Sequence, residues 1–567
     1  MSINMNLLGI QLRTRQRCRQ IFCTIRASST TPEIDSLKES DICYPTKRKK
    51  YRHLLTSSYN KSKNRIKNST LEKQYKQIAI SVTPLYSMSY DDQLKYKTVQ
   101  VNECLRKTMR KYVLTNNLPL SELLIKNIEK TNGSLCPMEP CLPSPLVHGY
   151  RMKDEFVVGR SLDGNPKTVG LTVGKGMNSF CVPVTYLSNI SEKHKEIAKV
   201  FQEFIRSSKF EPYTKHLSTS NNQTYYSSGH WRLICTRSTS SDESMSYVIF
   251  HPRRKPQEVI EEAKEELKNF YLHGPGRLCG ISTMFFQPTW KSRTNAHIIP
   301  FELLYGQPYV TETLLGYKFQ ISPDSFFQIN TSAAEVLYSV IKDSAKLTPN
   351  EVILDICCGT GSIGIVLAPN AKRLFGVEII QDAVNDAKVN AEINGVTNAD
   401  FICSRASLAL KQISLGTYFD PSETAVAVIN PGRSGVSKSV IRSIRRCKPI
   451  KRLVYVTCRP IGNTLTNFID LCRPPNEEFS GEAFVPVHAV PVDMFPQTLH
   501  CELVVCKKSV NPKEKKENRG LLIKLSLTVP PHPRHLIILF SFSSLSFFPE
   551  FSSLLTSIFS FFLVCSS

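Results

Sequence analysis

The sequence predicts an α/β protein in which a Rossmann-like, doubly wound domain follows a β-rich α+β region. The main observation is that apolar runs of strand length alternate with helical stretches between residues 331 and 508, a pattern typical of a mostly parallel sheet with helices on both faces. Residues 76–330 instead carry short alternating segments bounded by turn residues. A chain of 567 residues is also too long for one compact core.

The balance of charge favours a polyanionic partner. Lysine and arginine number 72 against 48 acidic residues, which gives a formal net charge of +24. Nucleic acid is the natural partner for such a chain. A membrane surface, or a basic import segment that inflates the total, would also explain the excess, and charge alone does not separate these readings.

Cysteine usage indicates a reducing compartment. The 18 cysteines are scattered along the chain and never occur as C-x-x-C, whereas secreted disulfide frameworks and zinc sites place them at short, regular spacings. We therefore expect no disulfide framework, no iron–sulfur cluster and no bound metal.

The amino-terminal segment predicts import into mitochondria. Residues 1–32 lack aspartate and glutamate and contain Arg13, Arg15, Arg17, Arg19 and Arg26. This composition is typical of a mitochondrial transit peptide, with a disordered basic arm as the alternative, and it places the protein in the mitochondrial matrix. Residues 33–75 remain basic and poor in apolar side chains, which predicts a disordered linker.

The carboxyl-terminal segment, residues 509–567, is expected to be a low-complexity tail without function. From residue 536 onward it consists mainly of Phe, Ser and Leu, the composition that a translated pyrimidine-rich noncoding stretch would give. Pro549 and Glu550 divide it into apolar pieces shorter than the roughly 20 residues of a spanning helix. We expect no stable membrane association.

Several elements can be placed in order along the chain. Asp163-Gly164-Asn165-Pro166 predicts a hairpin in the β-rich region, and the apolar spacing over 259–270 predicts a helix. A further helix opens the second domain near Thr331, with Ser332 and Glu335 in capping-box spacing. The strands that follow are "EVILDICC", "RLFGVEII", "AVAVINP" and "RLVYVTC".

The predicted sheet carries signs of a nucleotide-type site beyond the carboxyl ends of its strands, where ligands of such sheets bind. Gly359 and Gly361 follow the first strand, and Glu378 ends the second, where an acidic side chain can take ribose hydroxyls. With Asp355 ahead of the glycines, these residues suit S-adenosylmethionine, one acid meeting its amino group and the other its ribose. "GTGSIG" also matches the dinucleotide pattern, so an NAD-dependent oxidoreductase remains an alternative.

Four segments resemble a known family. "LDICCGTGSIG…VEII", "INPGRSGV", "LVYVTCRP" and "DMFPQTLHCELVV" are similar in order and spacing to the RNA uracil-5 methyltransferases, and "SPDSFFQIN" resembles the entry to their methyltransferase domain. The similarity extends over about residues 81–508. It implies a class I methyltransferase fold, S-adenosyl-L-methionine as cofactor, and methylation of uridine carbon 5 in mitochondrial RNA. The T-loop of tRNA is the expected target, with mitochondrial ribosomal RNA as a second candidate.

The resemblance also implies a catalytic pair. Cys458, at the end of a strand, would add to carbon 6 of uracil and so activate carbon 5, with Arg459 and Arg433 favouring its thiolate. Glu502 would then remove the proton from carbon 5, and His500 is the second choice of base. The plainer alternatives are a structural cysteine and a surface glutamate.

The resemblance assigns Gln328 and Asn430 to the cofactor site. Asn430 departs from the aspartate that is commoner in the family, although its amide can still donate and accept hydrogen bonds to uracil. This departure motivates the alternative function, an RNA-binding or RNA-folding protein with reduced or no turnover.

Two groups of side chains are candidates for RNA contact, although core packing or a solvated face would also explain them. They are Tyr150, Arg151, Lys153 and Phe156 in the β-rich region, and Arg442, Arg445, Arg446 and Lys448 in the second domain.

Overall fold

The computed structural model describes residues 71–115, 121–174, 179–217, 225–253, 256–289 and 299–510. The chain divides into two compact units, residues 1–511 and 512–567, and every described residue belongs to the first. The predicted transit peptide, most of the predicted linker and the tail beyond residue 510 lie outside the described residues.

The first sheet has seven strands in the order β3-β2-β1-β6-β7-β8-β9. Neighbouring strands run antiparallel except β7 and β8, which are parallel. Two hairpins, β4-β5 and β10-β11, stand apart from it. The strands are β1 Lys153–Gly159, β2 Thr168–Val173, β3 Phe180–Val182, β4 Thr214–Leu217, β5 Tyr225–Ser228, β6 Trp231–Ser238, β7 Ser244–Phe250, β8 Thr283–Pro288, β9 Glu302–Tyr305, β10 Val310–Leu314 and β11 Tyr317–Ile321.

The core of this region lies between the first sheet and three helices, α3 (Leu71–Val82), α6 (Glu192–Ser207) and α7 (Gln257–Leu272). A short 3-10 helix, η3 (Pro275–Cys279), follows α7. Two sequence predictions are confirmed here. The turn at 163–166 joins the antiparallel strands β1 and β2, and α7 buries the apolar face expected of a helix at 259–270.

The second sheet has the order β14-β13-β12-β15-β16-β18-β17. All neighbours are parallel except the pairs made by β18, which runs antiparallel to both β16 and β17. The strand order reverses between β12 and β15, which makes their carboxyl ends the expected ligand crevice. The strands are β12 Val352–Ile356, β13 Arg373–Glu378, β14 Ala399–Cys403, β15 Ala425–Ile429, β16 Ile450–Thr457, β17 Ala483–Val492 and β18 Glu502–Val510.

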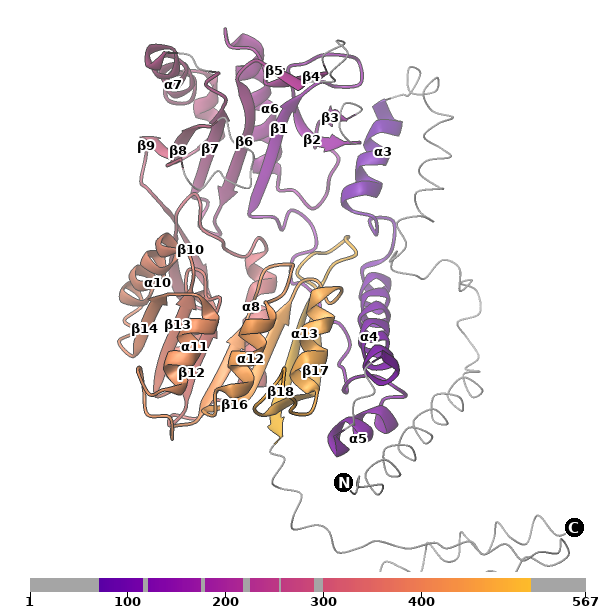
Figure 1. Cartoon of the computed structure of the whole chain (residues 1–567). Coiled ribbons are helices and arrows are strands. Elements are labelled where there is room, and N and C mark those ends of the chain that lie inside the picture. Colours follow the sequence, from indigo (N-terminus) through magenta and orange to yellow (C-terminus); the bar gives the residue numbers. More distant parts are fainter. Residues whose placement is uncertain are drawn as a thin grey trace, which may run out of the picture. The chain divides into compact units, whose positions relative to one another are not determined.

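Helices cover both faces of this sheet, so the prediction of a doubly wound, Rossmann-like domain is confirmed. Alternate residues of β12 enter different cores: Leu354 and Ile356 pack with α11, α12 and α13, whereas Ile353 packs with α8, α9 and α10. Figure 1 shows α11, α12 and α13 in front of the sheet and α8 behind it. The helices are α8 Thr331–Ala345, α9 Ser362–Leu367, η5 Ala368–Asn370, α10 Gln381–Ile393, α11 Ala406–Ser414, α12 Lys438–Arg446 and α13 Asn463–Cys472.

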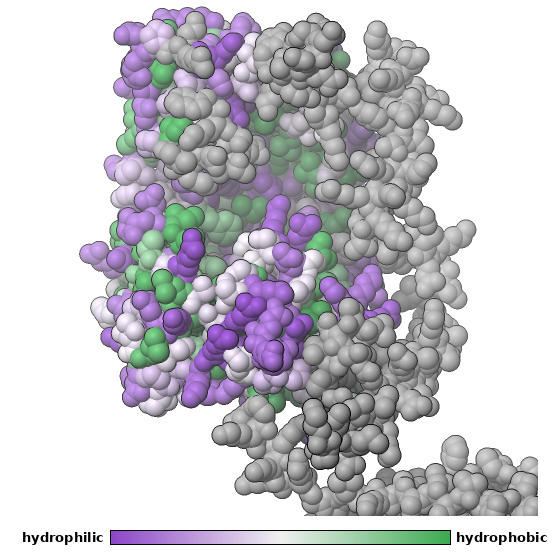
Figure 2. Space-filling view, in the orientation of Figure 1, coloured by the Kyte–Doolittle hydropathy of each residue, from purple (hydrophilic) through white to green (hydrophobic). Residues whose placement is uncertain are grey.

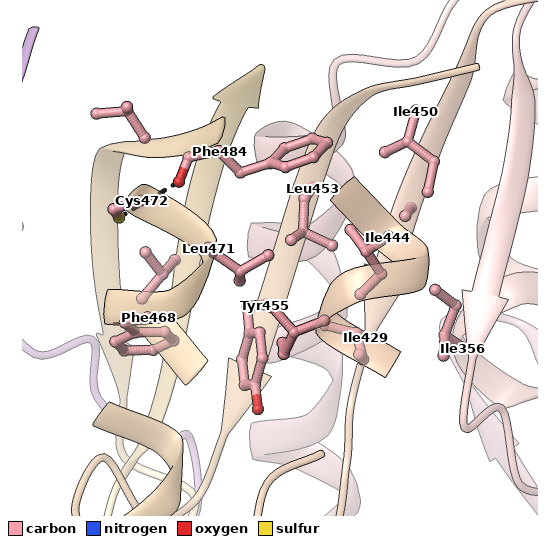
Figure 3. Close-up of a cluster of buried hydrophobic side chains, with 14 of the residues drawn as sticks. Ile356, Ile429, Ile444, Ile450, Leu453, Tyr455, Phe468, Leu471, Cys472 and Phe484 are labelled. Atoms are coloured by element: carbon pink, nitrogen blue, oxygen red, sulfur yellow. Dashed lines mark hydrogen bonds between the residues drawn. The ribbon is translucent and has the colours of Figure 1, made fainter. Parts of the chain in front are cut away.

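The core on the front face brings together strands and helices far apart in the sequence. Figure 3 shows Tyr455 and Leu453 of β16 lying between Phe468 of α13 and Ile444 of α12. The same core includes side chains from α4 (Tyr90–Thr115) and α5 (Glu122–Lys130), such as Leu105. These two helices precede the first sheet in the chain but pack on the second.

The start of α8 differs in detail from its prediction. The helix begins near Thr331 as expected, but its N-cap is Asn330, whose Oδ1 accepts a hydrogen bond from the Ala333 amide at 3.2 Å. Glu335 accepts instead from the amide of Leu315, at 2.9 Å. The capping box of Ser332 and Glu335 was therefore wrong, because a contact with the β10–β11 turn takes the carboxylate that the box would need.

Hydrophilic side chains gather over the face on which α12 and α13 lie, as Figure 2 shows. Arg446 and Lys448 are exposed, but Arg445 is only 1% exposed and donates hydrogen bonds to the carbonyls of Asp470 and Arg473, both at 2.7 Å. Arg445 is thus a structural residue.

Across the described ranges, no helix combines the length and the apolar character needed to cross a membrane.

Candidate active site

A glycine-rich loop connects β12 to α9 at the strand order reversal. Gly361 is the N-cap of α9 with a φ of 78°, and an added Cβ would lie 2.9 Å from the ring of Phe401, so this position needs glycine. Gly359 has a φ of 56°, but an added Cβ there would meet no atom within 4 Å. The backbone at Gly359 is therefore open to a ligand.

Asp355 lies inside the sheet beneath this loop. It is fully buried, and its Oδ2 accepts a hydrogen bond from the Gly364 amide at 2.9 Å. Burial raises the pKa of this carboxyl to about 7. Its other oxygen, Oδ1, has no hydrogen-bond partner among the described residues, and a buried acceptor of this kind suits a donor that the protein itself does not supply.

Glu378 joins the ends of β12 and β13. Its Oε2 accepts from the Gly359 amide at 3.2 Å, while its Oε1 accepts from the amides of Ile379 and Ile380 at 2.7 and 3.2 Å. These bonds fix the half-buried carboxylate beside the open stretch of the glycine loop. The acid predicted for ribose hydroxyls therefore lies where the glycines and the strand end meet.

Gln328 and Asn430, the other residues predicted for the cofactor site, lie on two other segments. Gln328 is 7% exposed and precedes α8, in a segment that Ser322 and Ser325 tie to Asp386 of α10 by hydrogen bonds. Asn430 is half-buried at the end of β15, and its backbone N–H donates to the carbonyl of Ile356 in β12 at 3.4 Å. The open glycine, the anchored Glu378 and the unpartnered oxygen of Asp355 fit the amino acid and ribose groups of S-adenosylmethionine.

Cys458 directly follows β16 and is partly exposed. Desolvation raises the pKa of its thiol, the negative charge of Glu502 raises it further, and Arg433 lowers it. The expected influence of Arg433 is present, but burial and Glu502 outweigh it, so the net pKa of the thiol lies above its ordinary value. Arg459 is exposed beside the cysteine.

Arg433 reaches this position on an anchored loop. Asn467 of α13, which is 3% exposed, accepts from the Val436 amide and donates to the Val436 carbonyl, both at 3.0 Å. Its Oδ1 also accepts from the hydroxyl of Tyr455 at 3.0 Å. The loop that follows β15 is thus held against the helix that follows β16.

Glu502 opens β18 and faces Cys458 across the sheet. Thr457 pairs with Leu503 in the antiparallel register, and one further step along both strands sets Cys458 opposite Glu502. Glu502 is 4% exposed, and burial raises the pKa of its carboxyl to about 8. No side chain or amide in the described ranges donates a hydrogen bond to it. His500 lies at the surface, where desolvation and the charges of Arg433, Lys97 and Arg459 lower its pKa.

Two features of the structure, one at Tyr338 and one at Phe326, were not predicted from the sequence. Tyr338 of α8 is buried, shares a 2.7 Å hydrogen bond with Ser362 of α9, and feels the charges of Asp355 and Glu502. Phe326, two residues before Gln328, is 68% exposed. The segment "SPDSFFQIN" contained this exposed aromatic ring, but sequence alone could not tell it from its buried neighbour Phe327.

The candidate RNA contacts of the β-rich region divide between core and surface. Phe156 is fully buried in the first core, and Tyr150 is 1% exposed and donates to the carbonyl of Pro496 at 3.0 Å. Arg151 is paired with buried Asp154, which also binds His194. Tyr150 and Phe156 are therefore structural residues, and the core alternative was right for both.

The fold and the site together define the class of protein. The strand order of the second sheet reverses between β12 and β15, and the antiparallel β18 lies beside β16. A glycine loop follows the first strand and an acid ends the second. These features are those of a class I S-adenosylmethionine-dependent methyltransferase. Residues 301–505 match the family described as tRNA (Uracil-5-)-methyltransferase. The chain belongs to the tRNA (uracil-5-)-methyltransferase family.

The relatives are similar over most of their length. The mouse protein tRNA (uracil-5-)-methyltransferase homolog B is 39% identical over 460 residues, which cover 80% of this chain and 89% of that protein. Mouse homolog A is 39% identical over 76% of this chain and 68% of its own length. The chain is therefore an enzyme with S-adenosylmethionine as cofactor, and its activity class is methylation of uracil carbon 5 in tRNA.

A solved structure shares the fold. The tRNA (uracil-54, C5)-methyltransferase of Pyrococcus abyssi, in complex with S-adenosyl-L-homocysteine, superposes with a TM-score of 0.50 at 20% identity. The match covers 75% of this chain and 84% of that chain. The predicted fold class is thereby confirmed from both sheet topology and structural similarity.

Replacing Glu502 with glutamine is expected to change how stability depends on pH. The folded carboxyl has a pKa of about 8 against an ordinary value of 4.5, so between these values the folded state holds a proton that the unfolded state releases. The free energy of unfolding should therefore fall as pH rises from about 4.5 to 8 in the unaltered protein. Glu502→Gln removes this pH dependence, so the free energy of unfolding of the variant should increase relative to that of the unaltered protein over the same pH range.

Denaturant unfolding at several pH values between 5.5 and 9 measures this difference. Glu477→Gln is the matched control, because Glu477 is exposed and its replacement removes no buried carboxyl. A Glu502→Gln advantage that stays constant with pH would contradict the burial of an ionisable group at this position.

Proposed function

We propose that the protein methylates carbon 5 of a uridine in a loop of mitochondrial tRNA, by covalent addition of Cys458 to carbon 6. One observation carries the proposal. The register of β16 and β18 sets a partly exposed thiol opposite a buried carboxyl, at the same edge of the sheet as the glycine loop that fits the cofactor. A nucleophile and a base at one strand end match what methylation at an unreactive ring carbon requires.

Cys458 performs the first step. Carbon 5 of uracil is a weak nucleophile, but a thiolate that forms a bond to carbon 6 turns the ring into an enolate with electron density at carbon 5. Arg433 assists by lowering the pKa of the thiol against the opposing effects of burial and Glu502. Because the net pKa is raised, we expect the reaction to speed up as pH rises above neutrality.

The cofactor site supplies the electrophile. S-adenosylmethionine, when bound by the glycine loop, Glu378 and Asp355, carries the methyl group that carbon 5 accepts, with S-adenosylhomocysteine as the other product. Gln328 and Asn430 lie between this site and the thiol in the proposed arrangement. The half-buried amide of Asn430 can donate to a uracil carbonyl or accept from its ring N–H.

Glu502 completes the reaction. It takes the proton from carbon 5, the electron pair of that C–H bond forms the C5–C6 double bond, and the C6–S bond breaks to return the thiolate of Cys458. A carboxyl whose pKa is about 8 is a stronger base than an ordinary glutamate once it is ionised. The surface position of His500 and its lowered pKa make it the poorer base.

A surface of the first sheet region supports RNA as the substrate. The rings of Tyr213 and His251 are stacked 4.9 Å apart, and the guanidinium of Arg232 lies 5.2 Å from the centre of the Tyr213 ring. All three side chains are partly exposed. Aromatic and cationic groups in contact offer stacking and charge to an unpaired nucleotide, and the target uridine must itself leave its stack to reach the thiol.

The second candidate function is an RNA-binding or RNA-folding protein with little or no turnover. It is favoured by Asn430, which stands where aspartate is commoner in the family. Activity measurements separate the two candidates, because both predict binding of RNA and only one predicts a methylated product.

Nucleoside mass spectrometry of an unmodified mitochondrial tRNA transcript, incubated with S-adenosylmethionine, tests the proposal. The unaltered protein should form 5-methyluridine, and Cys458→Ala should form none. Glu502→Gln should slow turnover and accumulate a protein–RNA adduct that survives denaturation, because release needs the base. Cys403→Ala is the control, since Cys403 is an exposed cysteine at the end of β14.

The outcomes of this experiment separate the substrates as well. A product from a mitochondrial ribosomal RNA fragment but not from tRNA would move the proposal to ribosomal RNA. Binding of both RNAs without product from either would favour the RNA-binding candidate.

Arg433→Gln is expected to shift the pH dependence of adduct formation toward higher pH, because it removes a charge that lowers the pKa of Cys458. The adduct is measured on a transcript that carries 5-fluorouridine, since fluorine cannot leave carbon 5 as a cation and the C6–S bond therefore persists. Arg459→Gln removes a neighbouring exposed arginine and serves as the control. An equal shift in both variants would contradict a specific role for Arg433.

The mitochondrial location is supported by the arginine-rich, acid-free composition of residues 1–32. A fluorescent protein fused behind residues 1–75 should enter mitochondria. Replacing the five arginines of residues 1–32 with glutamine should abolish import, whereas replacing five basic residues of 47–67 should not. A cytosolic signal from the unaltered fusion would contradict this location.

A further inference from the structure

A loop connects β17 to β18 and leads directly into Glu502. Residues 493–501 form this loop, and its two ends are held together because Val492 pairs with Glu502. Because the chain enters β18 from this loop, the position of the Glu502 carboxylate depends on the conformation of the loop as well as on the pairing of the strands. Most contacts that hold the loop come from segments hundreds of residues earlier in the chain.

One of these contacts is a buried ion pair. Lys97 of α4 and Asp493 lie 2.6 Å apart (Nζ to Oδ1), with side chains only 1% and 0% exposed. The same ammonium group donates to the carbonyl of Phe495 at 3.0 Å, and Asp493 Oδ1 accepts from the Phe495 amide at 3.0 Å. Lys97 thus holds the first turn of the loop at two atoms, Asp493 Oδ1 and the Phe495 carbonyl oxygen.

Hydrogen bonds continue from this turn toward Glu502. The hydroxyl of Thr498 donates to the Phe495 carbonyl at 2.8 Å, and that hydroxyl oxygen accepts from the His500 amide at 3.2 Å. A contiguous polar path therefore runs from Lys97 through Phe495 and Thr498 to the residue two positions before Glu502.

A second contact from α4 supports the other side of the loop. Gln93, one helical turn before Lys97 and 3% exposed, accepts from the Gln497 amide at 2.7 Å. Gln497 has a φ of 66°, a conformation that costs energy in a residue other than glycine. The Leu85 amide donates to the Gln497 carbonyl at 2.9 Å, so both backbone polar groups of this residue are held from outside the loop.

We infer that Lys97, with Gln93, is a positioning residue for the proton-removal step, and that it acts on Glu502 through the loop 493–501. The inference rests on the proposed role of Glu502. Lys97 does not approach the thiol or the cofactor loop in the contacts described above, so its loss should affect release of the product more than addition of Cys458. A residue that merely stabilised the fold would slow both steps alike.

The test compares two transcripts with the full-length protein and S-adenosylmethionine. On 5-fluorouridine RNA, adduct formation reports the steps before Glu502 acts. On ordinary RNA, turnover requires Glu502 as well. For Lys97→Met, adduct formation should stay within about twofold of the unaltered protein, while turnover falls by about tenfold to a hundredfold, because misplacing a reacting group by about 1 Å has effects of this size. Adduct should also accumulate on the ordinary transcript.

Two further variants make the result interpretable. Lys95→Met is the matched control, because Lys95 is on the same helix with its side chain 77% exposed, and it should behave as the unaltered protein does. Lys97→Met combined with Asp493→Asn leaves no unpaired buried charge. It keeps the test valid if the single variant does not fold, and it should show the same separation of the two steps.

The contrary outcomes are distinct. Ordinary turnover by both Lys97 variants, or equal slowing of adduct formation and turnover, would overturn the positioning role. Absence of any adduct between the unaltered protein and 5-fluorouridine RNA would overturn the proposed cysteine mechanism itself, and the inference with it.

Discussion

The antiparallel pairing of β18 with β16 is the constraint on which the candidate site depends. Every other neighbour of the central strands is parallel and ends at the same edge. Because β18 runs the other way, its first residue lies at that edge beside the last residues of β16. The thiol that directly follows β16 and the carboxyl that opens β18 are thereby brought close together, although 43 residues of sequence separate them.

Burial then sets the chemistry of the groups that meet there. Desolvation raises the pKa of Asp355 to about 7 and that of Glu502 to about 8, and it also raises the pKa of Cys458. Carboxyl groups with raised pKa values keep their protons near neutral pH and are stronger bases once they lose them. Charge from Arg433 acts in the opposite direction on the thiol. In the proposed mechanism, the negative charge of the base Glu502 therefore opposes the ionisation of the nucleophile Cys458.

Helices near the beginning of the described chain pack on the sheet formed by its last part. Side chains of α4 and α5 share a core with β16, β17 and α13, and Lys97 and Gln93 bind the loop that precedes β18. The core packed on the methyltransferase sheet thus includes helices from outside residues 331–508. The edge of this sheet that carries the candidate site is contacted both by helices that precede the first sheet in the sequence and by segments that follow it.

The sequence by itself determined the class of fold, because apolar runs of strand length that alternate with helices are compatible with few arrangements. It also located Asp355, Gly359, Gly361 and Glu378, because the ends of buried strands can be recognised from the hydrophobicity of the sequence. Tertiary structure decided what depends on contacts between distant segments. It showed that Tyr150, Phe156 and Arg445 are buried rather than available to RNA, and that Asn330 caps α8. It also decided the ionisation of Cys458, which depends on burial and on the distances to Glu502 and Arg433, and the pairing of Lys97 with Asp493 across 396 residues. Periodicity and spacing carry no information on such distances, since they arise only when the sheets and helices pack.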